Sequence, residues 1–101
     1  MSTHTAFVRL GEYGFTFQLK TDYQSTGFDS ATMHFTKPNG SVSSQTCDNN
    51  DGSAGEWGWI VTEDFFDQKG FWSVGLEIDL GDDGTRKSRR PALFLVGGDL
   101  E

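Results

Sequence analysis

Apolar and polar residues alternate with a period of two along much of the chain, which is the pattern of half-buried β-strands. The longest alternation covers residues 72–80, "WSVGLEIDL". One face of this segment carries Trp72, Val74, Leu76, Ile78 and Leu80. The other face carries small or acidic residues, so the pattern predicts a strand with one face toward a core and one toward solvent.

Several shorter segments repeat this alternation. We predict strands in "GFTFQLK" (14–20), "SATMHFTK" (30–37) and "EWGWIVT" (56–62), shorter apolar strands in "AFVRL" (6–10) and "ALFLV" (92–96), and a weak strand in "SVSSQT" (41–46). Glycine, proline, asparagine and aspartate separate these segments, with turns in "KPNG" (37–40) and "GDDG" (81–84) and a loop at 47–55. Such residues favour tight turns between strands.

The segment "TEDFFDQKG" (62–70) differs from the rest. It has a capping threonine, two acids, then Lys69 and Gly70, which is the order of a short helical turn. We predict one such turn here, with Phe65 or Phe66 closing the open end of the core.

Seven or eight short strands with one helical turn predict an all-β fold in a single domain, residues 1–101. An immunoglobulin-like antiparallel β-sandwich is the economical arrangement, and a small barrel is the alternative. Apolar residues make up only 35% of the chain, but nine Phe and three Trp supply large buried areas. Trp57, Trp59 and Trp72 fall on the predicted core faces.

The charge is unevenly distributed. The net charge is −7, yet four basic residues fall within five positions: Arg86, Lys87, Arg89 and Arg90. An acidic surface repels nucleic acid and anionic membranes, so neither is an expected partner. No stretch has the ~20 apolar residues of a membrane span, and the N-terminus lacks a signal-peptide pattern, which predicts a soluble protein made in a cytoplasm.

The basic cluster has two interpretations. If "GDDG" closes a hairpin with Leu80 opposite Thr85, the outer face becomes a ladder of opposite charges. In that register the outer face pairs Asp79 with Arg86, Glu77 with Ser88 and Gly75 with Arg90. On the apolar face, Lys87 lies beside Ile78 and Arg89 lies beside Leu76. The last two positions conflict with a buried face unless a bulge, a shifted register or an edge position relieves them. A structural hairpin is favoured, and a docking patch for an acidic protein partner is the alternative.

No pattern for catalysis, cofactor or metal emerges. The acidic loops do not fit the EF-hand spacing, and no nucleophile-elbow, phosphate-loop or dinucleotide motif occurs. His4 and His34 are the only histidines and Cys47 the only cysteine, too few for a convincing zinc site. We therefore expect a protein that is not an enzyme, with no catalytic, cofactor-binding or metal-binding residues.

Some aromatic residues lie off the predicted core. Phe71 falls on the face opposite Trp72, and Phe28 lies in a loop. Together with Phe65 or Phe66 they predict an exposed apolar patch suited to a partner subunit. Sandwiches that bind carbohydrate also expose tryptophans, so a sugar-binding module is a further alternative.

The order of short motifs carries a resemblance. A Lys-Pro-x-Gly turn (37–40) ends one strand, a threonine and acids (62–64) end another, a Gly-aromatic pair (70–72) opens the long strand, and Ser88 and Pro91 precede the final apolar strand. This order resembles the small Ig-like sandwich at the front of phage baseplate upper proteins, which recurs in other phage tail and virion accessory proteins. The likeness covers almost the whole chain.

The resemblance implies a non-enzymatic virion component that docks to other phage virion proteins in many copies. The chain departs from the family pattern because no fibre, coiled coil or receptor-binding head follows, which predicts an adaptor at the tail or baseplate. A capsid decoration protein on the major capsid protein is the alternative. The candidate docking residues are Phe65, Phe66, Phe71, Arg86, Lys87, Arg89 and Arg90.

Overall fold

The chain folds into eight strands and two short 3-10 turns within the residues that the structure describes. The computed structural model describes residues 7–21, 27–48, 50–87 and 91–97. The elements are β1 (Phe7–Val8), β2 (Thr16–Lys20), β3 (Ser30–Thr36), β4 (Val42–Thr46), η1 (Gly52–Ala54), β5 (Glu56–Ile60), β6 (Gly70–Asp79), η2 (Gly81–Asp83), β7 (Thr85–Lys87) and β8 (Ala92–Val96).

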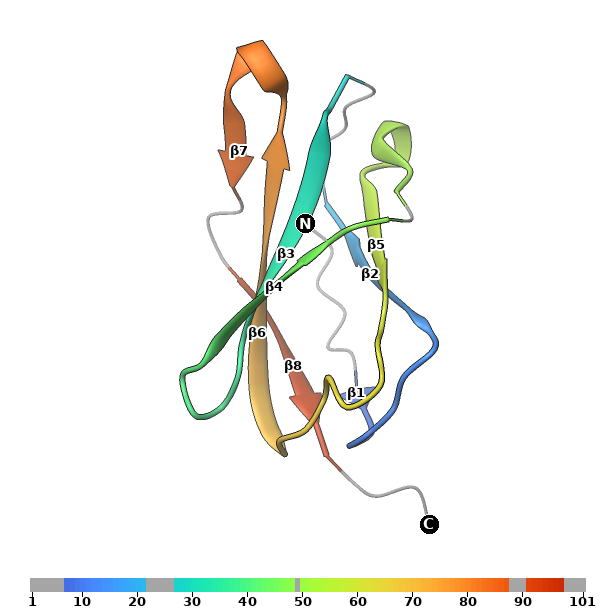
Figure 1. The fold of residues 1–101 in the computed structure, drawn as a ribbon, viewed down its shortest axis with the longest axis vertical. Coiled ribbons are helices and arrows are strands. Elements are labelled where there is room, and N and C mark those ends of the chain that lie inside the picture. The colour runs from blue at the N-terminus through green and yellow to red at the C-terminus, as the bar shows by residue number, and fades with distance from the viewer. Residues whose placement is uncertain (1–6, 22–26, 49, 88–90, 98–101) are drawn as a thin grey trace.

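Two sheets pack against each other (Figure 1). The larger sheet has the order β1-β8-β6-β3-β4, and β7 pairs with β6 beyond the end of β8. The smaller sheet consists of the antiparallel pair β2 and β5. All pairs are antiparallel except β1 with β8. The all-β sandwich predicted from the alternation is therefore confirmed.

The core lies between the facing sides of the two sheets. The predicted apolar faces of β3, β5 and β6 are buried, as the alternation indicated. Trp57 and Trp72 are completely buried, and Trp59 is 4% exposed. Burying residues of this size supplies most of the favourable free energy of a domain with few aliphatic side chains.

Phe66 lies at the centre of an aromatic cluster that joins both sheets. Its ring is fully buried, with the centroid of the Trp72 ring at 5.2 Å and that of Phe94 at 5.8 Å. Rings from β2 and β3 surround it on the other sides, with Phe17 at 6.0 Å and Phe35 at 6.2 Å. The connection between β5 and β6 thus closes the core, as the sequence predicted.

That connection is not helical, so the predicted helical turn over 62–70 is wrong. The Phe65 N–H donates to the Thr62 carbonyl at 3.3 Å, which makes a single turn. Asp64 has a φ of 64°, in the left-handed region, and this conformation prevents a right-handed helix from continuing. The short 3-10 turns lie instead at η1 and η2, where the sequence predicted a loop and a tight turn.

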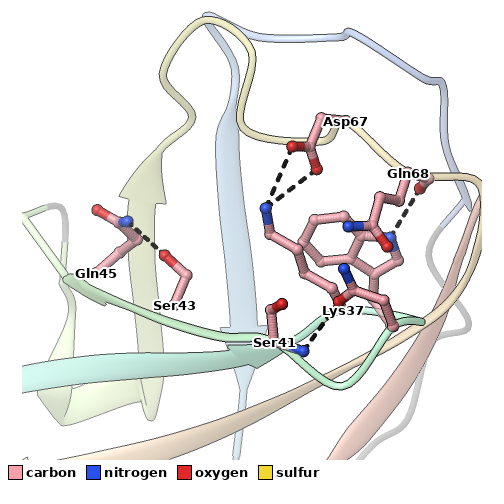
Figure 2. A network of polar contacts seen from close by, with 8 residues as sticks. Lys37, Ser41, Ser43, Gln45, Asp67 and Gln68 are labelled. Carbon is pink, nitrogen blue, oxygen red and sulfur yellow. Dashed lines mark hydrogen bonds and ion pairs between the residues drawn. The ribbon is translucent and has the colours of Figure 1, made fainter.

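A polar clamp fastens the β3–β4 turn to the same connection (Figure 2). Lys37 Nζ lies 3.1 and 3.2 Å from the two carboxylate oxygens of Asp67 and 5.7 Å from the centroid of the Trp72 ring. Trp72 Nε1 donates to the Gln68 carbonyl at 2.9 Å. The 37–40 turn and the start of β6, two of the short sequence motifs described above, are therefore in direct contact.

Cys47, at the end of β4, is 6% exposed. Burial, with a smaller contribution from the charge of Asp48, raises the pKa of its thiol from the ordinary 9.0 to about 12. The unfolded thiol loses its proton near the ordinary value while the native thiol keeps it. Below about pH 9 the thiol is protonated in both states and contributes no pH dependence. As the pH rises from there toward 12, only the unfolded thiol loses its proton, so the free energy of unfolding falls by about 1.4 kcal/mol per pH unit.

We expect the free energy of unfolding of the wild type to fall more steeply above about pH 9 than that of Cys47→Ala, by about 1.4 kcal/mol per pH unit. Urea titrations at pH values from about 8 to about 10.5 measure both slopes. The two proteins differ only at residue 47, so the difference between the slopes isolates Cys47. Parallel slopes would contradict the burial of its thiol.

Candidate docking surface

The basic hairpin pairs in a register one residue away from the predicted one. Glu77 lies opposite Lys87, Ile78 opposite Arg86 and Asp79 opposite Thr85. The expected pairing of Asp79 with Arg86 is therefore wrong. Because a shift of one residue moves every side chain to the other face, Lys87 stands on the outer face of the sheet rather than beside Ile78.

The turn explains this shift. Gly81–Asp83 forms a 3-10 turn, and the Leu80 N–H donates to the carbonyl of Gly84 at 2.8 Å. Leu80 thus pairs with Gly84 and not with Thr85. Gly84 has a φ of 93°, which glycine adopts without steric cost. The tighter closure moves Lys87 off the buried face of β6 and places Arg86, which stays exposed, opposite the buried Ile78 near the end of the strand.

The hairpin is only partly neutralised. Lys87 Nζ lies 3.8 Å from Glu77 Oε1, and the Lys87 side chain is 71% exposed, so the pair contributes at most about 1 kcal/mol. Arg86 is exposed and has no ion pair within the described ranges. Arg89 and Arg90 lie outside the described residues. Two predicted docking residues, Arg86 and Lys87, are therefore accessible at the tip of this hairpin.

Exposed apolar side chains gather on the outer face of the larger sheet, where β6 pairs with β8. Phe71 is 64% exposed and Leu93 is 62% exposed. Phe71 lies opposite Leu95, which is half-buried, and Leu93 lies diagonal to it across the strand pair. We call these three residues the outer-face patch. The sequence predicted the exposure of Phe71 and missed that of Leu93, because "ALFLV" is apolar on both faces.

Phe65 and Phe66 do not belong to an exposed patch, and that part of the prediction is wrong. Phe65 is 9% exposed and Phe66 is completely buried. Phe28 is also partly buried, with its ring 4.9 Å from that of Trp57. All three rings pack into or against the core instead of forming a surface patch.

A polar row crosses the same outer face nearer the hairpin tip. Ser44 Oγ lies 2.7 Å from His34 Nδ1, and His34 Nε2 lies 2.9 Å from Glu77 Oε1. The order serine, histidine, carboxylate resembles a nucleophile with its base. It lies on an open sheet face, with the His34 and Glu77 side chains 38% and 33% exposed. The contacts fasten β4, β3 and β6 together, and they place His34 on the polar face, as predicted.

No metal centre accompanies this row. Within the described part of the chain, no group of three or more His, Cys, Asp or Glu side chains is arranged to hold a metal ion. None of the described helices has the length and apolar character needed to cross a membrane. The surface that stands out is therefore the outer-face patch, with the basic hairpin at the other end of the same sheet.

Comparison of the chain with protein-family models, curated proteins and solved structures gives no match.

Proposed function

We propose that the chain is a non-enzymatic docking module of a tailed bacteriophage virion, acting as a small adaptor at the tail or baseplate. The phage assignment rests on the order of sequence motifs. The docking assignment is supported by the outer-face patch. A large aromatic side chain beside an exposed leucine and a half-buried one is costly to leave in water and is typical of the centre of a protein interface.

The position of the patch favours a protein partner over a small molecule. A sheet face is broad and flat, so it suits another protein surface, whereas small ligands bind in concave sites. Lys87 lies on the same outer face, beyond the polar row, and suits an acidic group at the rim of an interface, whereas Arg86, opposite the buried Ile78, lies on the other face. The adaptor would dock through an apolar centre with Lys87 at its rim, and this contact would be repeated around a symmetric assembly.

Two alternative functions remain to be compared. A capsid decoration protein would use the same patch on the major capsid protein, and only its location differs. A carbohydrate-binding module needs exposed planar aromatic rings. The burial of Trp57, Trp59 and Trp72 counts against that alternative.

We expect the double substitution Phe71→Asp/Leu93→Asp to abolish incorporation of the protein into phage particles while leaving its melting temperature nearly unchanged. Charged residues would remove the apolar centre of the interface, and both positions are already exposed. The readout is mass spectrometry of purified particles complemented with each variant. Cryo-electron microscopy of the wild-type particle then distinguishes tail or baseplate from capsid.

The matched control is Ile60→Asp, which places a charge at another exposed apolar position, 48% exposed, on the smaller sheet. Incorporation should survive this change. If Ile60→Asp abolished incorporation and the double variant did not, the interface would lie on the β2–β5 sheet instead of on the outer-face patch. Absence of the wild-type chain from purified particles would overturn the virion assignment.

A further inference from the structure

The edge strand β4 has an unpaired row of backbone groups. At its two ends, the Lys37 N–H donates to the Ser41 carbonyl and the Cys47 N–H donates to the Ala31 carbonyl, both at 2.8 Å. Backbone groups in an antiparallel pair alternate in direction. The N–H and C=O groups of Val42, Ser44 and Thr46 therefore point away from β3, and no backbone hydrogen bond reaches them from the described residues.

The edges of β5 and β7 are covered or charged. The outer edge of β5 is closed by the preceding loop, where Asp48 N–H donates to the Gly58 carbonyl at 3.0 Å and Gly58 N–H donates to Asn50 Oδ1 at 3.2 Å. The short strand β7 carries Arg86 and Lys87. Charged side chains and covering loops are the usual means of preventing unwanted strand pairing.

β4 lacks these protections. It has five residues, "VSSQT", without charge, proline or bulge, and no charged residue occurs from 38 to 47. Gln45 and Ser43 bond to each other on one side of the strand at 3.2 Å, and Val42 is 66% exposed on the other (Figure 2). Such an edge accepts one kind of partner, a second extended strand.

We infer that β4 pairs antiparallel with β4 of a second copy of this chain, about a two-fold axis at Ser44. In this register Val42 of each copy lies opposite Thr46 of the other, a β-branched pair that suits adjacent strands. All the outward N–H and C=O groups of the three residues then find partners. The two larger sheets join into one continuous sheet.

Charge directs two copies of the chain to this edge rather than to other parts of the surface. Two copies with a net charge of −7 repel each other over most approaches. β4 brings together only uncharged residues, and the nearest acid, Asp48, falls level with Gly40 of the other copy rather than with another acid. Like charges directly opposite each other would destabilise the pair, and this register avoids them. The inference does not depend on the proposed phage role or on the outer-face patch.

The test is the oligomeric state of the full chain, measured by analytical ultracentrifugation from about 20 µM to about 1 mM. We expect a monomer–dimer equilibrium within this range, because a five-residue edge is a small interface. In ¹⁵N NMR spectra, the concentration-dependent shifts should be largest at the amides of Val42, Ser44 and Thr46. A chain that stays monomeric at about 1 mM overturns the inference and leaves the edge to a strand from a different protein.

Variants with charged residues at positions 42 and 46 test the proposed pairing of β4 with β4 more directly. In the variant Val42→Lys/Thr46→Lys, lysines oppose lysines across the axis, so it should be monomeric, as should Val42→Glu/Thr46→Glu. An equimolar mixture of the two variants places lysine opposite glutamate and should restore the dimer. Both positions are exposed, so neither variant should unfold the chain. A lysine variant that dimerises as the wild type does, or concentration-dependent shifts centred on Phe71 and Leu93, would overturn the β4 interface.

Discussion

Replacing Phe66 with alanine is expected to lower the free energy of unfolding by about 3–5 kcal/mol. The side chain is completely buried and lies among rings contributed by both sheets. Its removal would leave a cavity at the point where the smaller sheet meets the larger one. Rigid aromatic neighbours such as Trp72 and Phe35 cannot collapse fully into that space, so the cost should fall in the upper part of the range for large-to-small substitutions.

Phe71→Ala provides the matched control, because it deletes the same atoms from a ring that is 64% exposed. Phe71→Ala should lower the free energy of unfolding by no more than about 1 kcal/mol. Urea unfolding of both variants, with equal m-values, measures the difference. Equal losses of stability would contradict the burial of Phe66 and would reopen a docking role for the 65–66 turn.

The faces of the strands were predictable because alternation is a local property. In β3, β5 and β6 each predicted inward residue is buried, including Met33, Trp59 and Ile78. The connection at 62–69 was not predictable in this way. Its two adjacent phenylalanines follow no period, and the left-handed backbone at Asp64 is invisible in the residue types. Only the tertiary packing brings both rings inside.

The candidate docking surface was predictable in part. Phe71 stood out because it lies out of phase with Trp72, whereas Leu93 is identified only when β8 is paired with β6. The hairpin register depends on the way the 81–84 turn closes, with Leu80 bonded to Gly84, so the predicted positions of Arg86 and Lys87 were wrong by one residue. The open edge of β4 was hidden for a similar reason, since strand order is a property of the whole sheet.

Gly70 shows how two separate sequence motifs depend on each other. It opens β6 with a φ of 128°, a conformation that residues with a side chain rarely adopt. A Cβ at this position would lie 3.0 Å from Cγ and 3.2 Å from Cβ of Pro38. The proline ring is stiff and belongs to a turn that Lys37 holds against Asp67, so it cannot move aside easily. The Gly-aromatic start and the Lys-Pro-x-Gly turn are therefore two sides of one contact.

Gly70→Ala should consequently lower the free energy of unfolding by about 2–5 kcal/mol, combining backbone strain with overpacking. Gly14→Ala is the matched control, because Gly14 has a φ of 84° but a Cβ there would meet no atom within 4 Å, so only the strain, about 1–2 kcal/mol, remains. Pro38→Ala, which removes Cγ, should recover part of the loss in the Gly70→Ala background and none in the Gly14→Ala background. Thermal and urea unfolding measure all three differences. Equal costs at the two glycines would show that the 37–40 turn does not press on β6, and the contact between the two motifs would lose its structural role.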